Sequence, residues 1–165
     1  MTKYPMPKQI LGFFGWLSIC FAAAALGALA SAQAGSFYKV LIRPLWAPPG
    51  WLFGPVWTVL YILMAISAWL VWREYGLRKA GPELALFVFQ LAVNALWTWL
   101  FFVCHLGALA FAEILFLWLL IIATAFMFWH RNRFAGALLI PYLAWVSFAS
   151  VLTWAVWKSN PHILA

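Results

Sequence analysis

The sequence predicts an all-α integral membrane protein, a bundle of five transmembrane helices that forms a single domain over residues 1–165. Of its 165 residues, 68% are hydrophobic and only 8% are charged, whereas a typical soluble domain is about 25% charged. A chain this short has too much surface for its volume to hide so many apolar side chains from water. Lipid must therefore cover its exterior, and continuous apolar runs indicate helices rather than the alternating strands of a barrel.

Five apolar windows are long enough to cross a bilayer, since a helix needs about 20 residues for this. The first ends in a half rich in Ala and Gly, Ala22 to Ala30, whose small side chains favour close approach of neighbouring helices. The second follows the proline-rich stretch Pro44 to Pro49, and the third opens at Gly81-Pro82, where proline suits a first helical turn. The fifth closes before Pro161. The expected spans are residues 10–30, 50–72, 83–103, 106–129 and 134–157.

The first window also has features of a cleavable secretory signal. Basic residues precede it, and small residues end it at Ala32-Gln33-Ala34. Its apolar stretch is long for a signal core, however, and the aromatic side chains of Phe13, Phe14 and Trp16 suit a permanent span. We expect a retained span, with cleavage as the alternative.

The basic residues between the windows predict the orientation. With five spans, seven fall on one side (Lys3, Lys8, Arg73, Arg78, Lys79, Arg131 and Arg133) and three on the other (Lys39, Arg43 and Lys158). By the positive-inside rule, the N-terminus lies in the cytoplasm. The net charge of +7 is explained by this orientation, and no nucleic-acid partner is expected. Helical spans favour a bacterial inner (cell) membrane.

The first loop, residues 31–49, is the only long connection between windows. Its segment Arg43-Pro44-Leu45-Trp46-Ala47-Pro48-Pro49-Gly50 is stiff, because proline fixes φ and biases the preceding residue toward extended geometry. Such a loop suits a lid over one end of the bundle. A structural connector at the membrane interface explains it equally well.

The charged and nucleophilic residues form no recognisable catalytic or metal-binding pattern. The chain has no aspartate, so a Ser-His-Asp triad is excluded, and its three acids are Glu74, Glu83 and Glu113. Glu113 lies inside a window but near its start, so we expect an interfacial position over a buried functional carboxylate. The three histidines and two cysteines are scattered along the chain. We therefore assign no catalytic residue by this route, no metal ligand and no required cofactor.

Aromatic residues give the positive signal, since the chain contains 13 tryptophans. Residues of a membrane belt cluster at segment ends, but several indoles lie deeper. Three stripes at helical spacing result: Trp57 and Tyr61; Gln90, Asn94 and Trp97; and Tyr142, Trp145 and Ala149. Converging indoles with a few polar groups suit a flat, apolar, polycyclic ligand. Packing of helix against helix is the alternative.

The residues in these stripes resemble the TspO/MBR family, the tryptophan-rich sensory proteins whose mitochondrial relatives are the translocator protein or peripheral benzodiazepine receptor. The resemblance covers nearly the whole chain. Four motifs in order carry it: Arg43-Pro44-Leu45-Trp46-Ala47-Pro48-Pro49, Trp57-Thr58-Val59-Leu60-Tyr61, Asn94-Ala95-Leu96-Trp97 leading to Phe101-Phe102, and Pro141-Tyr142-Leu143-Ala144-Trp145.

The resemblance implies a five-helix bundle, usually a homodimer, whose first loop covers a pocket. Members of the family bind porphyrins such as protoporphyrin IX, isoquinoline and benzodiazepine compounds, and sterols. It thus implies a membrane tetrapyrrole-binding sensor or carrier, with porphyrin as ligand. By matching position, the implied ligand-binding residues are Tyr38, Trp46, Trp57, Tyr61, Asn94, Trp97, Trp145 and Ala149.

Two other functions remain open at this point. One is light- and oxygen-dependent degradation of bound porphyrin, in which Trp57 and Trp145 would carry oxidising equivalents. The other is secondary transport of a sterol, a lipid or another small molecule. The chain departs from the family at Trp99, where many bacterial relatives have proline, which predicts a straighter third span or a tighter pocket. Thr153 replaces a common asparagine, and residues 152–158 lack the central tyrosine of the sterol-recognition pattern.

Overall fold

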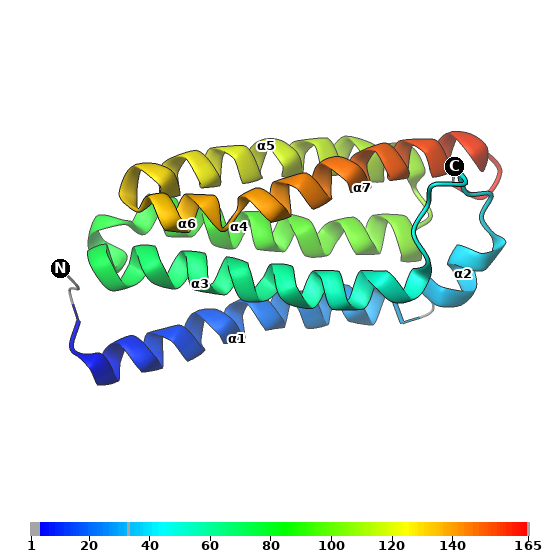
Figure 1. Cartoon of the computed structure of the whole chain (residues 1–165). Helices are drawn as coiled ribbons and strands as arrows, with labels where there is room; N and C mark the ends of the chain where they lie inside the picture. Colours follow the sequence, from blue (N-terminus) through cyan, green and yellow to red (C-terminus); the bar gives the residue numbers. More distant parts are fainter. Residues whose placement is uncertain (1–3, 33, 165) are drawn as a thin grey trace.

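The computed structural model describes residues 4–32 and 34–164 (Figure 1). Five helical spans are long and apolar enough to cross a membrane, which confirms the predicted fold class and makes the chain a multi-pass membrane protein. Each span consists of one long helix, in three cases with a short helical segment at one end. The spans are α1 (Met6–Ala30), η1 (Gly50–Leu52) with α3 (Phe53–Lys79), α4 (Gly81–Thr98) with η2 (Trp99–Val103), α5 (Gly107–Arg131), and α6 (Arg133–Ala137) with α7 (Ile140–Ser159).

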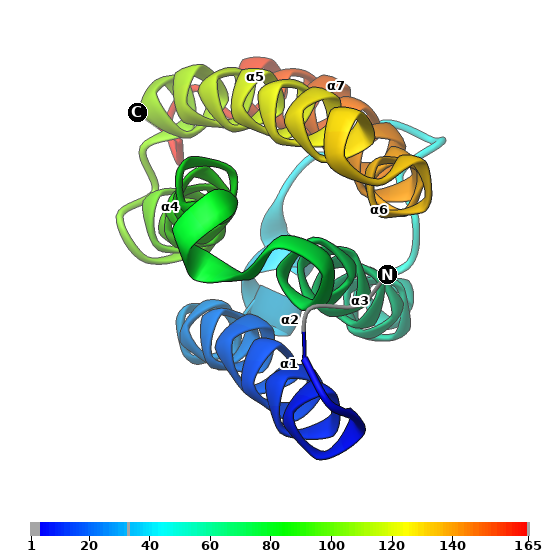
Figure 2. The same cartoon turned by 90° about the vertical axis from the view of Figure 1, so that its left-hand side faces the viewer.

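The spans are packed in layers. Viewed along the bundle, Figure 2 shows α1 on one side of α3 and α4, and α5 and α7 on the other side. The short helix α2 (Ala34–Val40) lies at the end of the bundle that also holds the C-terminus, away from the N-terminus (Figure 1). Consecutive spans are antiparallel. The connection between α1 and α3 is longer than the others and holds the additional helix α2.

Local sequence explains where the helices begin and end. Proline stands in the first turn of α1, α4 and α7, where its missing N–H has no helical partner to lose. The second span continues to Lys79, beyond the expected end at Trp72. Near its end Gly76 has φ 68°, a value that glycine adopts without steric cost. Asn132 caps α6, since its side chain accepts a hydrogen bond from the Ala135 N–H at 3.0 Å.

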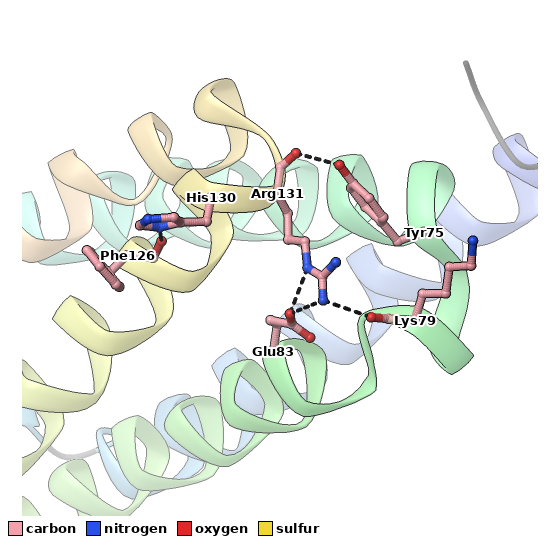
Figure 3. A network of polar contacts seen from close by, with 6 residues as sticks. All are labelled: Tyr75, Lys79, Glu83, Phe126, His130 and Arg131. Carbon is pink, nitrogen blue, oxygen red and sulfur yellow. Dashed lines mark hydrogen bonds and ion pairs between the residues drawn. The ribbon is translucent and has the colours of Figure 1, made fainter.

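A polar network ties three spans together at the end of the bundle opposite to α2 (Figure 3). Arg131 on α5 donates from Nε to Glu83 Oε1 on α4 at 2.7 Å, and from its second terminal nitrogen to the Lys79 carbonyl at 3.0 Å. The Tyr75 hydroxyl of α3 donates to the Arg131 carbonyl at 2.9 Å. Glu83 is buried, so Arg131 neutralises a carboxylate that would otherwise be costly inside the bundle.

Candidate ligand-binding cavity

A cavity of about 480 Å³ lies in the half of the bundle beneath α2. This volume falls within the range of about 300–1,000 Å³ typical of small-molecule sites. All five spans and α2 contribute to its wall, and none of the described residues that line it is charged. The wall is mainly aromatic and aliphatic, with hydroxyl, amide and indole groups as its polar atoms. Such a lining suits a largely apolar ligand with a few hydrogen-bonding groups.

The structure brings seven of the eight residues expected at the site to this cavity. They are Tyr38 from α2, Trp57 and Tyr61 from α3, Asn94 and Trp97 from α4, and Trp145 and Ala149 from α7. The eighth residue, Trp46, is not among the described residues that line the cavity. It lies in the first loop, where its ring packs edge-on against Phe148 with the centroids 5.8 Å apart. Trp46 therefore packs the proline-rich part of the loop against α7.

Two polar side chains that line the cavity, Tyr61 and Asn94, belong to a hydrogen-bonded chain that ends at Tyr142 behind the wall. The Tyr61 hydroxyl donates to Asn94 Oδ1 at 3.0 Å, and Asn94 Nδ2 donates to the Tyr142 hydroxyl at 2.6 Å. All three side chains are buried. The Asn94 amide thus cross-links α3, α4 and α7, and only part of its hydrogen-bonding capacity is left for a ligand.

The indoles of the wall are fixed by neighbouring rings. Trp97 stacks on Phe101 with centroids 5.2 Å apart, and Trp145 meets Phe53 edge-on at 5.9 Å. The buried Nε1 atoms of Trp97 and Trp145 have no hydrogen-bond partner among the described residues. A buried N–H without a partner is costly. An acceptor group on a bound molecule that reached either N–H would remove this cost.

The first loop covers the cavity with a short helix rather than with its proline-rich part. Residues Ala34, Gly35 and Tyr38 of α2 line the cavity, together with Gly50 at the end of the loop. The Tyr38 hydroxyl donates to the Pro48 carbonyl at 3.2 Å, so the proline-rich part is joined to α2. We call residues 34–49 the lid segment.

The sequence-based expectation missed the contribution of the first span. Phe21, Ala24, Gly27 and Ala28 of α1 all line the cavity. The signal was the Ala- and Gly-rich half of the first window, which was interpreted only as a surface for close helix packing. Such packing does occur, since a Cβ added to Gly27 would lie 3.4 Å from Thr98 Oγ1. The small side chains of α1 also leave room for the cavity beside this contact.

Trp99, the first departure from the family, stands at the start of the π-helical end of the third span. The Cys104 N–H donates to the Trp99 carbonyl at 2.9 Å, a π-helical bond that widens the turn. Trp99 does not line the cavity. Its Nε1 donates to the Leu26 carbonyl of α1 at 3.2 Å, on the lipid-facing side. Thr153, the other departure, lines the cavity, and its hydroxyl is bound to the Ala149 carbonyl at 2.7 Å.

Glu113, expected near the membrane interface, is buried against its neighbours in the bundle. Its exposed fraction is only 9%, and neither carboxylate oxygen has a hydrogen-bond partner among the described residues. Gln90, expected on the same stripe as Asn94, is fully buried, and its amide also has no partner there. Neither side chain lines the cavity. Both were difficult to place from sequence, because helix faces that pack against other helices and faces that line the cavity are equally apolar.

The chain was compared with known proteins. The model of a family described as the TspO/MBR family matches residues 16–158. Protein CrtK from Rhodobacter capsulatus is 41% identical over 146 residues, which cover 86% of this chain and 88% of the relative. Tryptophan-rich protein TspO from Chlorobaculum tepidum is 35% identical over 158 residues, covering 94% of this chain and 100% of the relative. The human translocator protein is 37% identical over 126 residues, covering 75% of each chain.

Proposed function

We propose that this chain, which belongs to the TspO/MBR family, binds a flat tetrapyrrole such as protoporphyrin IX inside the membrane, as a sensor or carrier. The observation that carries the proposal is the uncharged cavity of about 480 Å³ with Trp57, Trp97 and Trp145 in its wall. Indole rings offer flat apolar faces to a macrocycle, and stacking contributes about 0.5–1.5 kcal/mol for each aromatic pair. Smaller flat molecules of the isoquinoline or benzodiazepine type would fit the same wall.

Two polar features support a ligand that carries acceptor groups at its edge. The free indole N–H groups of Trp97 and Trp145 would donate to a carboxylate or carbonyl. Asn94 would act mainly through its neighbours, because its amide holds Tyr61 and Tyr142 in place. Apolar contact would supply most of the affinity, and the indole donors would set the orientation of the ligand.

A titration in the dark tests this proposal. Protoporphyrin IX is added to the purified protein in detergent, and quenching of tryptophan fluorescence is followed in the wild type and in Trp57→Ala, Trp145→Ala and Trp154→Ala. Trp154 is the matched control, since it lies on the same helix as Trp145 but is 48% exposed and does not line the cavity. We expect saturable quenching that is about tenfold weaker in the two cavity variants and unchanged in the control. Non-saturable quenching that is equal in all four proteins would mean that porphyrin only partitions into the micelle.

Light- and oxygen-dependent degradation of the bound porphyrin is the second candidate. The Trp57 ring lies 5.7 Å from that of Tyr61 and 6.2 Å from that of Tyr142, which provides neighbouring oxidisable rings beside the cavity. Dioxygen would be the oxidant. Illumination of the titrated samples tests this candidate: product that forms with the wild type and not with Trp57→Ala or Trp145→Ala supports it. Equal bleaching of free and bound porphyrin contradicts it.

We further propose a bacterial inner membrane location with the N-terminus in the cytoplasm, supported by the seven basic residues on one side and three on the other. The lid segment then faces outward.

A homodimer is also proposed. The exposed face of α4 carries the small residues Ala85 and Ala92, which allow helices to approach closely in lipid. Crosslinking of cysteines introduced at these two positions tests the dimer.

A further inference from the structure

The side chain of Asn160, at the end of α7, binds the backbone of Ile42, 118 residues earlier in the chain. Its Oδ1 accepts a hydrogen bond from the Ile42 N–H at 2.8 Å, and its Nδ2 donates to the Ile42 carbonyl at 2.9 Å. The same Nδ2 donates to the Val156 carbonyl at 2.7 Å. One carboxamide therefore satisfies both backbone groups of a lid residue and ties them to the last helix.

Apolar side chains surround these hydrogen bonds. Asn160 is only 4% exposed, and Leu41 and Leu164 are 4% and 0% exposed. Both leucines belong to one buried cluster with Val156. The Asn160 carbonyl accepts from the Leu164 N–H at 2.9 Å, which folds the C-terminal turn back onto this cluster. Because buried polar groups lose much free energy when their partners are removed, Ile42 is a firmly held point of the lid segment.

Ile42 lies between the two parts of the lid segment. Before it comes α2, whose Tyr38 lines the cavity. After it comes the proline-rich part, which returns to α2 through the Tyr38–Pro48 hydrogen bond and through the Arg43 guanidinium, 4.4 Å from the centre of the Tyr38 ring. The connection at Ile42 is thus a place where both parts are joined to the body of the bundle, by two half-buried hydrogen bonds to the buried Asn160 side chain.

We infer that Asn160 is a positioning residue for the cavity: by fixing Ile42, it holds the lid segment closed, and it thereby sets the rate at which the cavity opens. The inference rests on the proposed function, because a lid has a role only if the cavity takes a ligand. The turn of α7 that precedes Asn160 lines the cavity through Thr153 and Val156. Val156 therefore lies both in the cavity wall and in the buried cluster that holds Leu41 of the lid segment.

Two variants and one control separate this role from general stability. Asn160→Ala removes all three hydrogen bonds. Asn160→Ser keeps a short hydroxyl that cannot reach both backbone groups of Ile42, and it serves if the alanine variant does not fold. The control is Asn132→Ala, since Asn132 also forms two buried or half-buried side-chain bonds, to Glu74 and to Ala135, at the opposite end of the bundle.

Three measurements follow, and the first two use no porphyrin. Hydrogen exchange at the Ile42 amide reports the hydrogen bond directly. The rate at which a maleimide modifies a cysteine introduced at Ala149, in a Cys104→Ser background, reports access to the cavity, since Ala149 lines it and the remaining Cys20 is buried. Association and dissociation of protoporphyrin IX in the dark, by stopped-flow quenching, report the passage of ligand. We expect the Asn160 variants to raise each rate about fivefold or more, and Asn132→Ala to leave each within about twofold.

The outcomes distinguish the inference from the proposed function. If exchange at Ile42 and cysteine modification stay at wild-type rates in both Asn160 variants, Asn160 does not position the lid. Faster exchange with unchanged cysteine modification also overturns the inference, because the bonds then stabilise the loop without controlling the cavity. If both rates rise but the wild type shows no saturable porphyrin binding, the proposed function fails while the positioning role of Asn160 stands.

Discussion

Asn94 donates from Nδ2 to the Tyr142 hydroxyl at 2.6 Å, and both side chains are buried where α4 meets α7. The Asn94 Oδ1 also accepts from the Tyr61 hydroxyl. One amide therefore holds a tyrosine of α3 and a tyrosine of α7 in a fixed arrangement. In lipid a buried polar group cannot form a hydrogen bond with water instead, so a strong contribution is expected. Measured interhelical hydrogen bonds nevertheless contribute only about 0.6 kcal/mol on average.

Replacing Asn94 by leucine should destabilise the bundle more than Tyr142→Phe does. The leucine variant leaves two buried hydroxyls without a partner, at a cost of about 1–3 kcal/mol, whereas Tyr142→Phe leaves one amide N–H unpaired. Thermal unfolding in detergent, followed by helical circular dichroism, measures the difference. Equal midpoints for the wild type and both variants would show that ordered water replaces the missing groups and that the chain of bonds adds little.

Gly136 should not tolerate alanine. A Cβ at this position would lie 2.8 Å from the backbone N and Cα of Trp129, so the α5–α6 turn would have to shift. Overpacking of this kind costs about 1–3 kcal/mol. Gly15→Ala is the control, because nothing lies within 4 Å of an added Cβ there. In a helix interior alanine is also more stable than glycine. The unfolding midpoint should fall for Gly136→Ala and stay level or rise for Gly15→Ala. A midpoint for Gly136→Ala that matches the wild type would contradict the close approach of the two segments.

The five spans and most of the cavity wall were predictable, because each rests on a strong signal. A run of about 20 apolar residues has few alternatives to a membrane span, and Trp57, Asn94 and Trp145 are conspicuous inside such runs. The first loop was expected to be either a lid or a structural connector, and the helix α2 within it was not expected. That helix is only seven residues long, and tertiary contacts such as the Tyr38–Pro48 bond hold it in place.

The sequence could not indicate which face of the first and fourth spans points inward. In a soluble helix the polar face marks the outside, but in lipid both faces are apolar. Phe14 and Trp16 illustrate the difficulty, since they are close in sequence and similar in polarity, yet 57% and 7% exposed. The role of α1 in the cavity and the burial of Glu113 were missed for this reason. The Asn160–Ile42 contact joins segments too distant in sequence for any local pattern to predict.

Arg131 should be needed mainly because Glu83 is buried. The variant Arg131→Ala leaves that carboxylate without its partner. The loss of stability is moderated because the Arg131 side chain is 36% exposed, so solvent already screens the ion pair. We expect a loss of about 1–3 kcal/mol for Arg131→Ala, and a smaller loss for the double variant Arg131→Ala with Glu83→Gln, in which no charge is left unpaired. Thermal unfolding of the two single variants and the double variant gives the coupling between them. Strictly additive losses would mean that the ion pair does not act as a unit.

The unpartnered indole N–H groups should distinguish ligands by their acceptors. Trp145→Phe keeps an aromatic face in the cavity but removes the donor. If that donor binds a propionate of protoporphyrin IX, the variant should lose about tenfold in affinity for the free acid, since a hydrogen bond to a charged group is worth about 1.5–3 kcal/mol. The loss should be smaller for the dimethyl ester, whose neutral acceptor binds more weakly. The matching experiment with Trp97→Phe shows which indole faces the acid. Equal losses for acid and ester in both variants would mean that the indoles act only through their rings, and the two donors would then need another partner, such as a bound water.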